Sequence, residues 1–504
     1  MGVDVARLKD MRRDAARACL DWSERRRHLA GVCGGAISPA PLFAVVIPLL
    51  CAGCLSHQAL DAADAGKTSA YQAGAAGFDI ETVQAQGDSL TAVDLFLSIP
   101  LQSLIFEKTT GGFRSRYEIT ARLSDRHSGQ LAGETTWAET TFVERYEATQ
   151  ASGPIVVRKR IAAPPGSYRA DVTLEDLIGA RKASRAQSAT IADLSDVRPS
   201  LGRVTLVAGT RDGVPLPQIS FFVPVRKDST GCTVGAYNLP ASSDSRFELC
   251  VLRFVTDTSV GLPPFYYSNL PVPLGHWLIN FGNPDTAYHF SRTVRAAHRN
   301  ELLEFQIPPL RQGMYRIDIT AATRTPGGTD TTLSAERYYS IRGPGFPRPV
   351  TFAELIDAAV YIATPREMAA LRQAGGAEEQ RKHFEALWLS FAGDPARASA
   401  LIRKYYGRVE EANRLFTIFR EGWRTDRGML YCVLGPPSEI TNRLDTQTWY
   451  YGLSGNAVDN TYVFQRVVRS GDGLTVEDYI LYRQGRYEVF WDRMISRWRS
   501  GEPL

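Results

Sequence analysis

The sequence lacks the residue clusters by which catalytic and metal sites are usually recognised. Its seven histidines are scattered singly, and no His-Glu-x-x-His, Gly-x-Ser-x-Gly, phosphate-loop or dinucleotide-binding pattern occurs. Metal sites need converging ligands, and nucleophilic catalysis needs a nucleophile with a base beside it. The sequence therefore predicts no metal and no cofactor, and it favours a non-enzymatic protein.

Strong charge is also missing. The formal net charge is +4, and residues 1–53 carry +3 of it, so the rest of the 504-residue chain is nearly neutral. A protein that binds a phosphate backbone needs a concentrated basic surface. We therefore expect no nucleic acid among its partners.

Cysteine is scarce in the expected folded part of the chain. Four of the seven cysteines lie at or before Cys54, which leaves Cys232, Cys250 and Cys432. Cys232 and Cys250 flank a connection rich in Gly, Pro and Ser, so we predict that they form a disulfide between neighbouring strands. Cys432 lies in a short apolar run and is predicted to be a buried free thiol.

The N-terminal residues have the pattern of a targeting segment. After a basic stretch that ends at Arg27, no Asp, Glu, Lys or Arg occurs before Asp61, and Pro41–Leu50 is an apolar run. Basic residues, an apolar run and small residues before a cleavage point are typical of a secretory signal. Ala52-Gly53-Cys54 resembles a bacterial lipoprotein box, although the basic region is long and a cysteine precedes Ala52 where Leu is usual. Residues 1–54 are therefore predicted to direct export, with Cys54 lipidated after cleavage.

Two alternatives to a cleaved signal remain open. Leu29–Leu55 contains no charged residue and would serve as an uncleaved membrane anchor, although its Gly and Pro content disfavours a regular span. The Cys-x-x-Cys spacing at Cys51 and Cys54 is that of a redox motif, but no βαβ pattern surrounds it. We expect an exported protein of the cell envelope, periplasmic or an outer-membrane lipoprotein, attached through its N-terminal lipid or anchor.

The middle of the chain has the period of β-strands. Residues 55–78 are rich in Ala, Gly and Asp without an apolar period, and are predicted to form a flexible tether. Alternation then begins, as in Tyr117–Leu123, where every second residue is apolar. Similar runs, separated by Gly, Ser and Asp turns, continue to about residue 345, which predicts β-sandwiches.

An internal repeat divides this β-rich region in two. Pro164–Thr173 and Arg311–Thr320 share Gly-x-Tyr-Arg-x-Asp-(Val/Ile)-Thr. In Ig-like sandwiches a Tyr entering a late strand bonds back to the backbone, and Tyr168 and Tyr315 fit that role. Coincidence between two amphipathic strands is the alternative. The repeat predicts two tandem Ig-like β-sandwiches, at residues 79–190 and 195–345.

The last third, residues 351–504, changes to a helical period. Thr351 and Thr364 each precede a Glu by three residues, which is the pattern of a capping box, and a long amphipathic helix is expected from Pro395. Four strand-like runs follow, beginning with Met429–Leu434. The pattern predicts an α+β domain with helices first and a small antiparallel sheet after them. The C-terminal Arg- and Trp-rich run is expected to pack on that sheet, with docking to a membrane or partner as the alternative.

One motif in this third carries a resemblance. Gly422-Trp423-Arg424-Thr425-Asp426-Arg427-Gly428 is followed by an apolar run, by Gly435-Pro436-Pro437 and by a Trp-Tyr-Tyr run. The stretch resembles the GWxTD domain over roughly residues 351–490. That resemblance implies a bacterial protein, often secreted or lipid-anchored, with β-sandwich modules upstream. It implies a fold more than a function.

Each motif residue has a structural interpretation. The residues concerned are Gly422, Trp423, Thr425, Asp426, Arg427, Gly428, Gly435 and Pro436. Gly422 is expected to end the long helix, Trp423 to anchor it, and Thr425 and Asp426 to bond nearby backbone N–H groups. Arg427 would pair with Asp426 or a carbonyl. A catalytic interpretation would make Asp426 a general base, but it lacks a nucleophile or His nearby.

These observations predict a non-enzymatic binding or scaffold protein of the cell envelope. Its partners would be other envelope proteins or surface ligands, and the membrane through the N-terminus. Two alternatives remain: an envelope hydrolase whose carboxylate site the sequence does not reveal, and an assembly factor for a secreted complex.

Overall fold

The computed structural model describes most of the chain beyond residue 76. The described residues are 67–68, 77–85, 91–149, 154–196, 198–211, 214–240, 244–266, 279–324, 329–452, 460–471 and 474–502. Every described residue belongs to one unit of the chain, Ala62–Leu504. The predicted lipidation residue Cys54 lies outside the described residues. Among the helices within them, none is long and apolar enough to cross a membrane.

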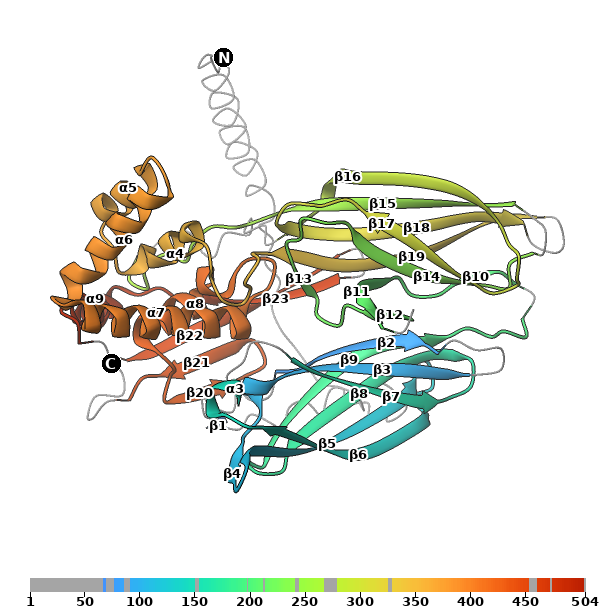
Figure 1. The fold of residues 1–504 in the computed structure, drawn as a ribbon, viewed down its shortest axis with the longest axis horizontal. Coiled ribbons are helices and arrows are strands. Elements are labelled where there is room, and N and C mark those ends of the chain that lie inside the picture. Colours follow the sequence, from blue (N-terminus) through green and yellow to red (C-terminus); the bar gives the residue numbers. More distant parts are fainter. Residues whose placement is uncertain are drawn as a thin grey trace, which may run out of the picture. The chain divides into compact units, whose positions relative to one another are not determined.

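The described chain begins mostly as β-sheet and ends in a helical region with a small sheet (Figure 1). We call residues 79–191 the first β unit. Its strands form two antiparallel sheets, one in the order β2-β3-β7 and one in the order β4-β5-β8-β9 with β6 also on β5. The strands are β2 (Asp79–Gln84), β3 (Ala92–Pro100), β4 (Glu107–Thr109), β5 (Gly112–Asp125), β6 (Leu131–Val143), β7 (Pro154–Ala162), β8 (Gly166–Asp176) and β9 (Arg181–Ile191), with short helices η1 (Leu101–Ser103) and α3 (Tyr146–Thr149).

The two sheets of the first β unit share one core. Leu95 of β3, Ile119 of β5 and Leu174 of β8 are fully buried in it. Burial alternates along β5 as its sequence period predicts, because successive side chains of a strand point to opposite faces.

We call residues 200–342 the second β unit. One sheet has the order β10-β14-β11-β12, with β17 also on β14, and the other has the order β13-β19-β18-β15-β16. All pairs are antiparallel except β13 with β19, which is parallel. The strands are β10 (Ser200–Leu201), β11 (Thr205–Arg211), β12 (Val214–Pro217), β13 (Phe222–Pro224), β14 (Thr230–Tyr237), β15 (Asp244–Thr256), β16 (Ile279–Arg295), β17 (Glu301–Ile307), β18 (Gly313–Arg324) and β19 (Asp330–Arg342).

The repeated tyrosines make the same contact in both units. The Tyr168 hydroxyl donates to the Pro164 carbonyl at 2.7 Å, and the Tyr315 hydroxyl donates to the Arg311 carbonyl at 2.9 Å. Both tyrosines are buried and stand near the start of β8 and β18. The predicted backbone bonds are therefore present, each to a residue four positions earlier.

The predicted disulfide is wrong, because Cys232 and Cys250 are both free thiols. Cys232 lies in β14 and Cys250 in β15, and these strands belong to different sheets. Cys232 is buried in the core, whereas along β15 it is Leu249 and Val251 that are fully buried, so Cys250 points to the opposite face. The sequence showed two strands joined by a turn, but not that the connection passes from one sheet to the other.

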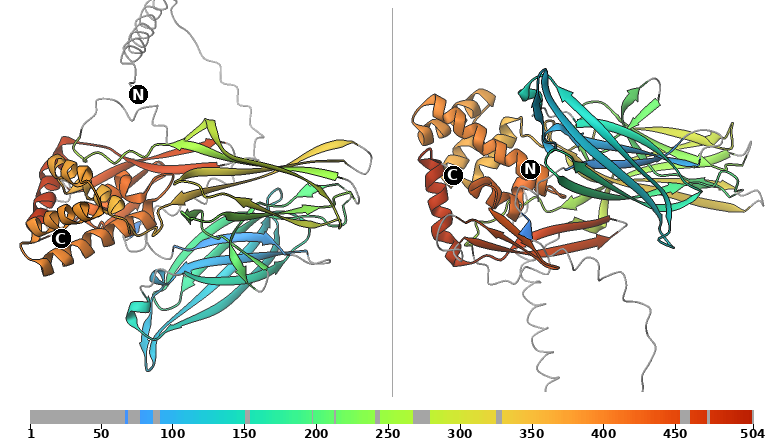
Figure 2. Two further views of the ribbon diagram at one scale, coloured as in Figure 1. Left: turned by 45° about the horizontal axis from the view of Figure 1, so that its top comes forward. Right: turned by 90° about the horizontal axis from the view of Figure 1, so that it is seen from below.

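The C-terminal domain, residues 352–499, combines helices with an antiparallel sheet in the order β1-β20-β21-β22-β23. Figure 2 shows its orange helices to one side of the red strands. The elements are α4 (Phe352–Ala358), η2 (Ala359–Tyr361), α5 (Pro365–Gln373), α6 (Ala377–Ala392), α7 (Pro395–Phe416), η3 (Gly422–Arg424), α8 (Asp426–Leu434), β20 (Glu439–Asn442), β21 (Thr446–Tyr450), β22 (Thr461–Gly471), β23 (Leu474–Leu481), η4 (Gly485–Tyr487) and α9 (Glu488–Arg499). Strand β1 (Lys67–Thr68) pairs with β20, so part of the range predicted as a tether is a strand.

The predicted helix starts are confirmed. Thr351 with Glu354 and Thr364 with Glu367 form complete capping boxes, and the Asp394 side chain accepts from the Arg397 N–H before α7. These bonds satisfy N–H groups that have no partner inside the helix.

The predicted strand at Met429–Leu434 is wrong, because these residues belong to helix α8. All six are buried, so the run shows neither a two-residue nor a 3.6-residue period. A short apolar run of this length fits a buried strand and a buried helix equally well. Cys432, within it, is buried and free as predicted.

The C-terminal helix α9 packs its aromatic side chains inside the domain. Trp491 and Trp498 are buried. The Trp498 indole donates to the Val433 carbonyl at 2.9 Å and lies 5.2 Å from the Tyr405 ring. The tryptophan at position 498 therefore packs against α7 and α8, rather than on the sheet as predicted.

Candidate functional site

The Gly422–Gly428 motif forms a short helix and the start of another. Gly422–Arg424 is the 3-10 helix η3, and Thr425 is the N-cap of α8. The Thr425 hydroxyl donates to the Gly422 carbonyl at 2.7 Å and accepts from the Gly428 N–H at 3.0 Å. The Thr425 side chain thus caps both the end of η3 and the beginning of α8.

Both motif glycines allow close backbone packing. A Cβ on Gly422 would lie 1.9 Å from the Ala412 carbonyl oxygen of α7, and one on Gly428 would lie 1.9 Å from the Gly422 carbonyl oxygen. Real Cβ atoms do not approach this closely, so each site requires glycine. The prediction that Gly422 ends the long helix is wrong, since α7 ends at Phe416. The glycine is needed for contact with α7.

Trp423 fixes the motif against the helices. Its side chain is buried and lies 6.1 Å from the Tyr361 ring. Its backbone N–H donates to the Asn413 side chain at 3.3 Å, and its carbonyl accepts from the Tyr361 hydroxyl at 2.9 Å. The Arg424 guanidinium covers the indole at 4.4 Å. Trp423 therefore joins α7, η2 and the motif.

Asp426 is held by a distant arginine. Arg483 donates to both of its oxygens, at 2.6 and 3.1 Å, and the Leu481 N–H donates to Oδ2 at 2.8 Å. Asp426 is 4% exposed. The predicted partner Arg427 instead lies over the rings of Tyr479, at 4.1 Å, and Phe416, at 5.0 Å, where burial lowers its pKa. Asp426 thus ties the start of α8 to the end of β23.

A second buried carboxylate lies beside this ion pair. Asp478 of β23 is fully buried and accepts from Arg420 at 3.1 Å. Burial raises the pKa of Asp478, an effect that Arg420 opposes and the neighbouring Asp426 reinforces. Arg420 also lies 3.6 Å from Asp257 in the second β unit.

Residues in and near the motif form hydrogen bonds with a segment of the second β unit. We call residues 257–266, which follow β15, the docked segment. The Gly261 N–H donates to the Arg424 carbonyl at 2.8 Å, and the Gln484 N–H donates to the Pro264 carbonyl at 3.1 Å. Three arginines donate to further carbonyls of the segment: Arg424 to Thr258, Arg420 to Ser259 and Arg483 to Leu262. Five backbone groups of the segment are therefore bonded from the C-terminal domain.

Gly261 lies directly over Asp426. A Cβ at this position would be 3.2 Å from Asp426 Oδ1 and 3.3 Å from the Thr425 carbonyl oxygen. This contact is tighter than side chains usually make, so the segment covers the carboxylate closely. Asp426 therefore has both oxygens bonded and a backbone lying over it, which is unlike an accessible general base.

Gly435 and Pro436 mark the exit from α8. Gly435 has φ of 87°, a conformation that favours glycine, and its N–H bonds to the Tyr431 carbonyl at 2.9 Å. Its own carbonyl accepts from the Tyr451 hydroxyl at 3.0 Å. Pro436 is exposed.

The arrangement bonds backbone groups of the docked segment. Among the described residues no group of three or more His, Cys, Asp or Glu could hold a metal ion. Sequence reasoning identified Asp426 but missed Arg420, Asp478, Arg483 and the docked segment. None of these lies within the motif, and ion-pair partners distant in sequence leave no local pattern.

Comparisons with known proteins agree with the motif. The family model of the GWxTD domain matches residues 328–500. No curated protein matches the chain.

Similar solved structures include red sea bream transglutaminase, with 9% identity over 53% of this chain and 31% of that one, at a TM-score of 0.17. They also include the α2-macroglobulins of E. coli and Salmonella, with 10% and 12% identity over 53% and 54% of this chain, at TM-scores of 0.17 and 0.18. The matched parts cover 16% and 17% of those two chains, so this chain corresponds to less than a third of each of the three proteins. Likenesses at such TM-scores do not define a shared fold. The family match and the geometry of Gly422–Gly428 together show that residues 328–500 of this chain form a GWxTD domain.

Proposed function

We propose that this protein is a non-enzymatic binding or scaffold protein of the cell envelope, exported and anchored through lipid on Cys54. The single observation that supports a binding role most directly is the contact between the motif region and the docked segment. Arg420, Arg424 and Arg483 all bond backbone carbonyls of that segment, and Asp426 holds Arg483 in place. Such charge-assisted bonds hold one part of the chain against another and require no reaction.

We further propose that the two β units are Ig-like sandwiches. In each unit two sheets share one core, and in each a tyrosine near the start of a late strand bonds a carbonyl four residues back. This combination is typical of the sandwich domains that many cell-surface proteins carry.

A role in assembling a secreted complex is the second candidate. Strands β6 and β16 are 13 and 17 residues long, and within the described part of the chain each pairs with a single neighbouring strand. An unpaired strand edge can accept a strand from another protein.

Two experiments test the proposal. Replacing Cys54 with Ser should move the protein from the membrane fraction to the soluble periplasmic fraction, and an unchanged membrane fraction would contradict the lipid anchor. Crosslinking in intact cells, followed by identification of the crosslinked peptides, should then capture defined envelope proteins. A folded Asp426→Asn protein that keeps those crosslinks but has lost its biological activity would favour the hydrolase instead.

A further inference from the structure

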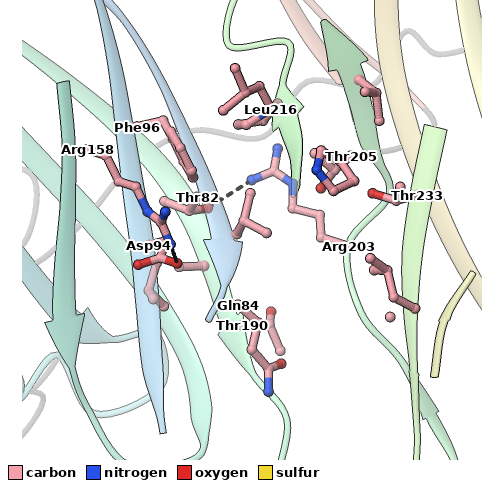
Figure 3. A pocket seen from close by; sticks show the side chains of 18 of the residues that line it. Thr82, Gln84, Asp94, Phe96, Arg158, Thr190, Arg203, Thr205, Leu216 and Thr233 are labelled. Carbon is pink, nitrogen blue, oxygen red and sulfur yellow. Dashed lines mark hydrogen bonds and ion pairs between the residues drawn. The ribbon is translucent and has the colours of Figure 1, made fainter. Parts of the chain in front are cut away.

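A cavity lies at the junction of the two β units (Figure 3). Its volume is about 260 Å³. Strands β2, β3, β7 and β9 line it from the first unit, and β11, β12, β14 and β17 from the second. None of the motif residues contributes to it, so this cavity is separate from the site described above. Concave sites with an apolar lining and a few fixed polar groups are where small ligands bind.

The charged lining of the cavity is mainly basic. It consists of one carboxylate, Asp94, and three arginines, Arg158, Arg160 and Arg203. Arg158 donates to Asp94 at 2.6 Å, and Arg160 donates to both of its oxygens at 2.8 and 2.9 Å. Burial by itself would raise the pKa of Asp94, but the two arginines hold it below its ordinary value. The Asp94 carboxylate is thus already paired with two arginines, and Arg203 adds a positive charge that Asp94 does not neutralise.

Arg203 is fixed in position but poorly matched in charge. It reaches from the second unit toward Thr82 in the first, as Figure 3 shows. Its Nη1 donates to the Ser188 carbonyl at 2.9 Å and to the Thr82 hydroxyl at 3.3 Å, both uncharged acceptors. The closest carboxylate among the described residues is Glu81, 4.0 Å away, and that group is already bonded by Arg337 at 2.7 Å. Arg203 has 31% of its side chain exposed and shares the Glu81 carboxylate with Arg337, so its charge is only partly neutralised, and a bound anion would relieve this.

Apolar side chains and hydroxyls complete the lining. Phe96 and Leu216 lie toward the top of the view in Figure 3, above the Arg203 guanidinium. Thr205 and Thr233 add hydroxyl groups from the second unit. An anion bound at Arg203 would therefore have hydrogen-bond donors near its charge and apolar surface near its body.

We propose that this cavity binds a compact organic anion, whose carboxylate or phosphate pairs with Arg203 and whose apolar body contacts Phe96 and Leu216. Such a group would join the two β units, because it would bond an arginine of one and pack on side chains of both. This inference does not depend on export, on lipidation or on the role of the GWxTD motif.

Calorimetric titration of the purified full chain tests the proposal with four probes of one shape. Phenylacetate and phenyl phosphate carry the two anionic groups, 2-phenylacetamide is neutral, and phenethylamine is a cation. At least one anion should bind saturably with one site per chain, the amide at least tenfold more weakly, and the amine not at all. The anion that binds more tightly identifies the head group. Absence of saturable binding by both anions would overturn the proposal.

Three variants locate the binding. Arg203→Gln removes the charge while keeping hydrogen-bonding capacity, and it should weaken anion binding at least tenfold. Leu216→Trp leaves the charge and fills the cavity, and it should abolish binding of the tighter anion. Arg246→Gln is the matched control, since Arg246 is an exposed arginine of β15 that does not line the cavity. Anion binding that is unaffected by both Arg203→Gln and Leu216→Trp would place the ligand elsewhere and refute the assignment.

Discussion

At the residue scale, the ion pair between Asp426 and Arg483 joins the motif to the rest of its domain. Both side chains are largely buried, with 5% and 16% of the side chain exposed. Arg483 also donates to the docked segment, so Asp426 orients a group that binds it. Removing one partner of a buried pair leaves the other charge without compensation, and this is the main energetic effect of such substitutions.

We therefore expect Asp426→Asn to lower the free energy of unfolding by about 3–5 kcal/mol, the usual scale for breaking a buried ion pair. The double variant Asp426→Asn/Arg483→Met removes both charges and should be more stable than Asp426→Asn alone. Denaturant unfolding of both proteins, with Arg397→Met as the exposed control, measures the difference. Equal stability of Asp426→Asn and the original protein would show that the pair does not hold the motif.

The sequence predicted which motif residues matter, but not most of their contacts. Tyr168 could be identified because its hydroxyl bonds a carbonyl only four residues away, and Trp423 because a large aromatic side chain in a folded domain is usually buried. The Arg483 partner of Asp426 lies 57 positions further along, and no local pattern indicates it. The same limit explains the wrong disulfide, since the sheet to which Cys250 belongs is decided by pairing with β16 and β18.

At the scale of elements, the docked segment can bond to the motif only because its backbone at Gly261 lies close to Asp426 and Thr425. Gly261→Ala places a Cβ 3.2 Å from Asp426 Oδ1, which a small shift relieves, whereas Gly261→Val adds two methyl groups that the covered site has no room for. We expect Gly261→Val to release residues 257–266, while Gly261→Ala changes little. Hydrogen exchange should show faster exchange of the Gly261 and Gln484 amides in the valine variant alone. Unchanged protection in Gly261→Val would contradict the docking contact.

Helix α9 is tied to α5 by a pair that titrates. Arg499 donates to both oxygens of Glu367 at 2.9 Å, and this bond lowers the pKa of Glu367 from 4.5 to about 2. A carboxyl with a lowered folded-state pKa stabilises the protein above pH 4.5, and this contribution is lost as the pH falls toward 2. Because Glu367 is partly exposed, we expect about 1 kcal/mol.

Glu367→Gln should therefore show a smaller loss of stability between pH 4.5 and pH 2 than the original protein. Thermal unfolding across this range measures it, with Glu385→Gln as the control for an exposed helical carboxylate. If Glu367→Gln and the original protein lose the same amount of stability between pH 4.5 and pH 2, the bond between Arg499 and Glu367 does not stabilise the fold.

The sequence predicted most elements of the C-terminal domain through their end signals. Capping boxes located α4 and α5 because their bonds are local. The same reasoning fails for α8, because the sequence predicts that Thr425 bonds nearby backbone N–H groups but not that it begins a helix. It also fails for β20, a four-residue strand too short to show a period. Where an element is buried on all sides, tertiary packing decides its type.

At the scale of the whole described chain, a buried ion pair joins the two β units. Arg337 of β19 donates to Glu81 of β2 at 2.7 Å, and both side chains are almost completely buried. The Arg337 guanidinium also donates to the Gln218 carbonyl at 3.2 Å. This pair lies 256 positions apart in sequence, so the sequence predicted two β units without predicting what connects them.

Glu81→Gln should loosen this junction more than replacement of both partners does. The single change leaves Arg337 buried without its carboxylate, at a cost of about 3–5 kcal/mol, whereas Glu81→Leu/Arg337→Met removes both charges and is expected to recover part of that loss. Because Glu81 and Arg337 lie in different β units, hydrogen exchange of β2 and β19 reports on the junction from both sides and is the measurement of choice. Glu81→Gln should raise exchange in both strands together, while β22 of the C-terminal domain serves as an internal reference.

Since the pair between Arg337 and Glu81 is shielded from solvent, 0.5 M salt should not reproduce the effect in the original protein. Exchange that rises in β2 alone would mean that Glu81 stabilises only its own sheet, and that other contacts hold the two β units together.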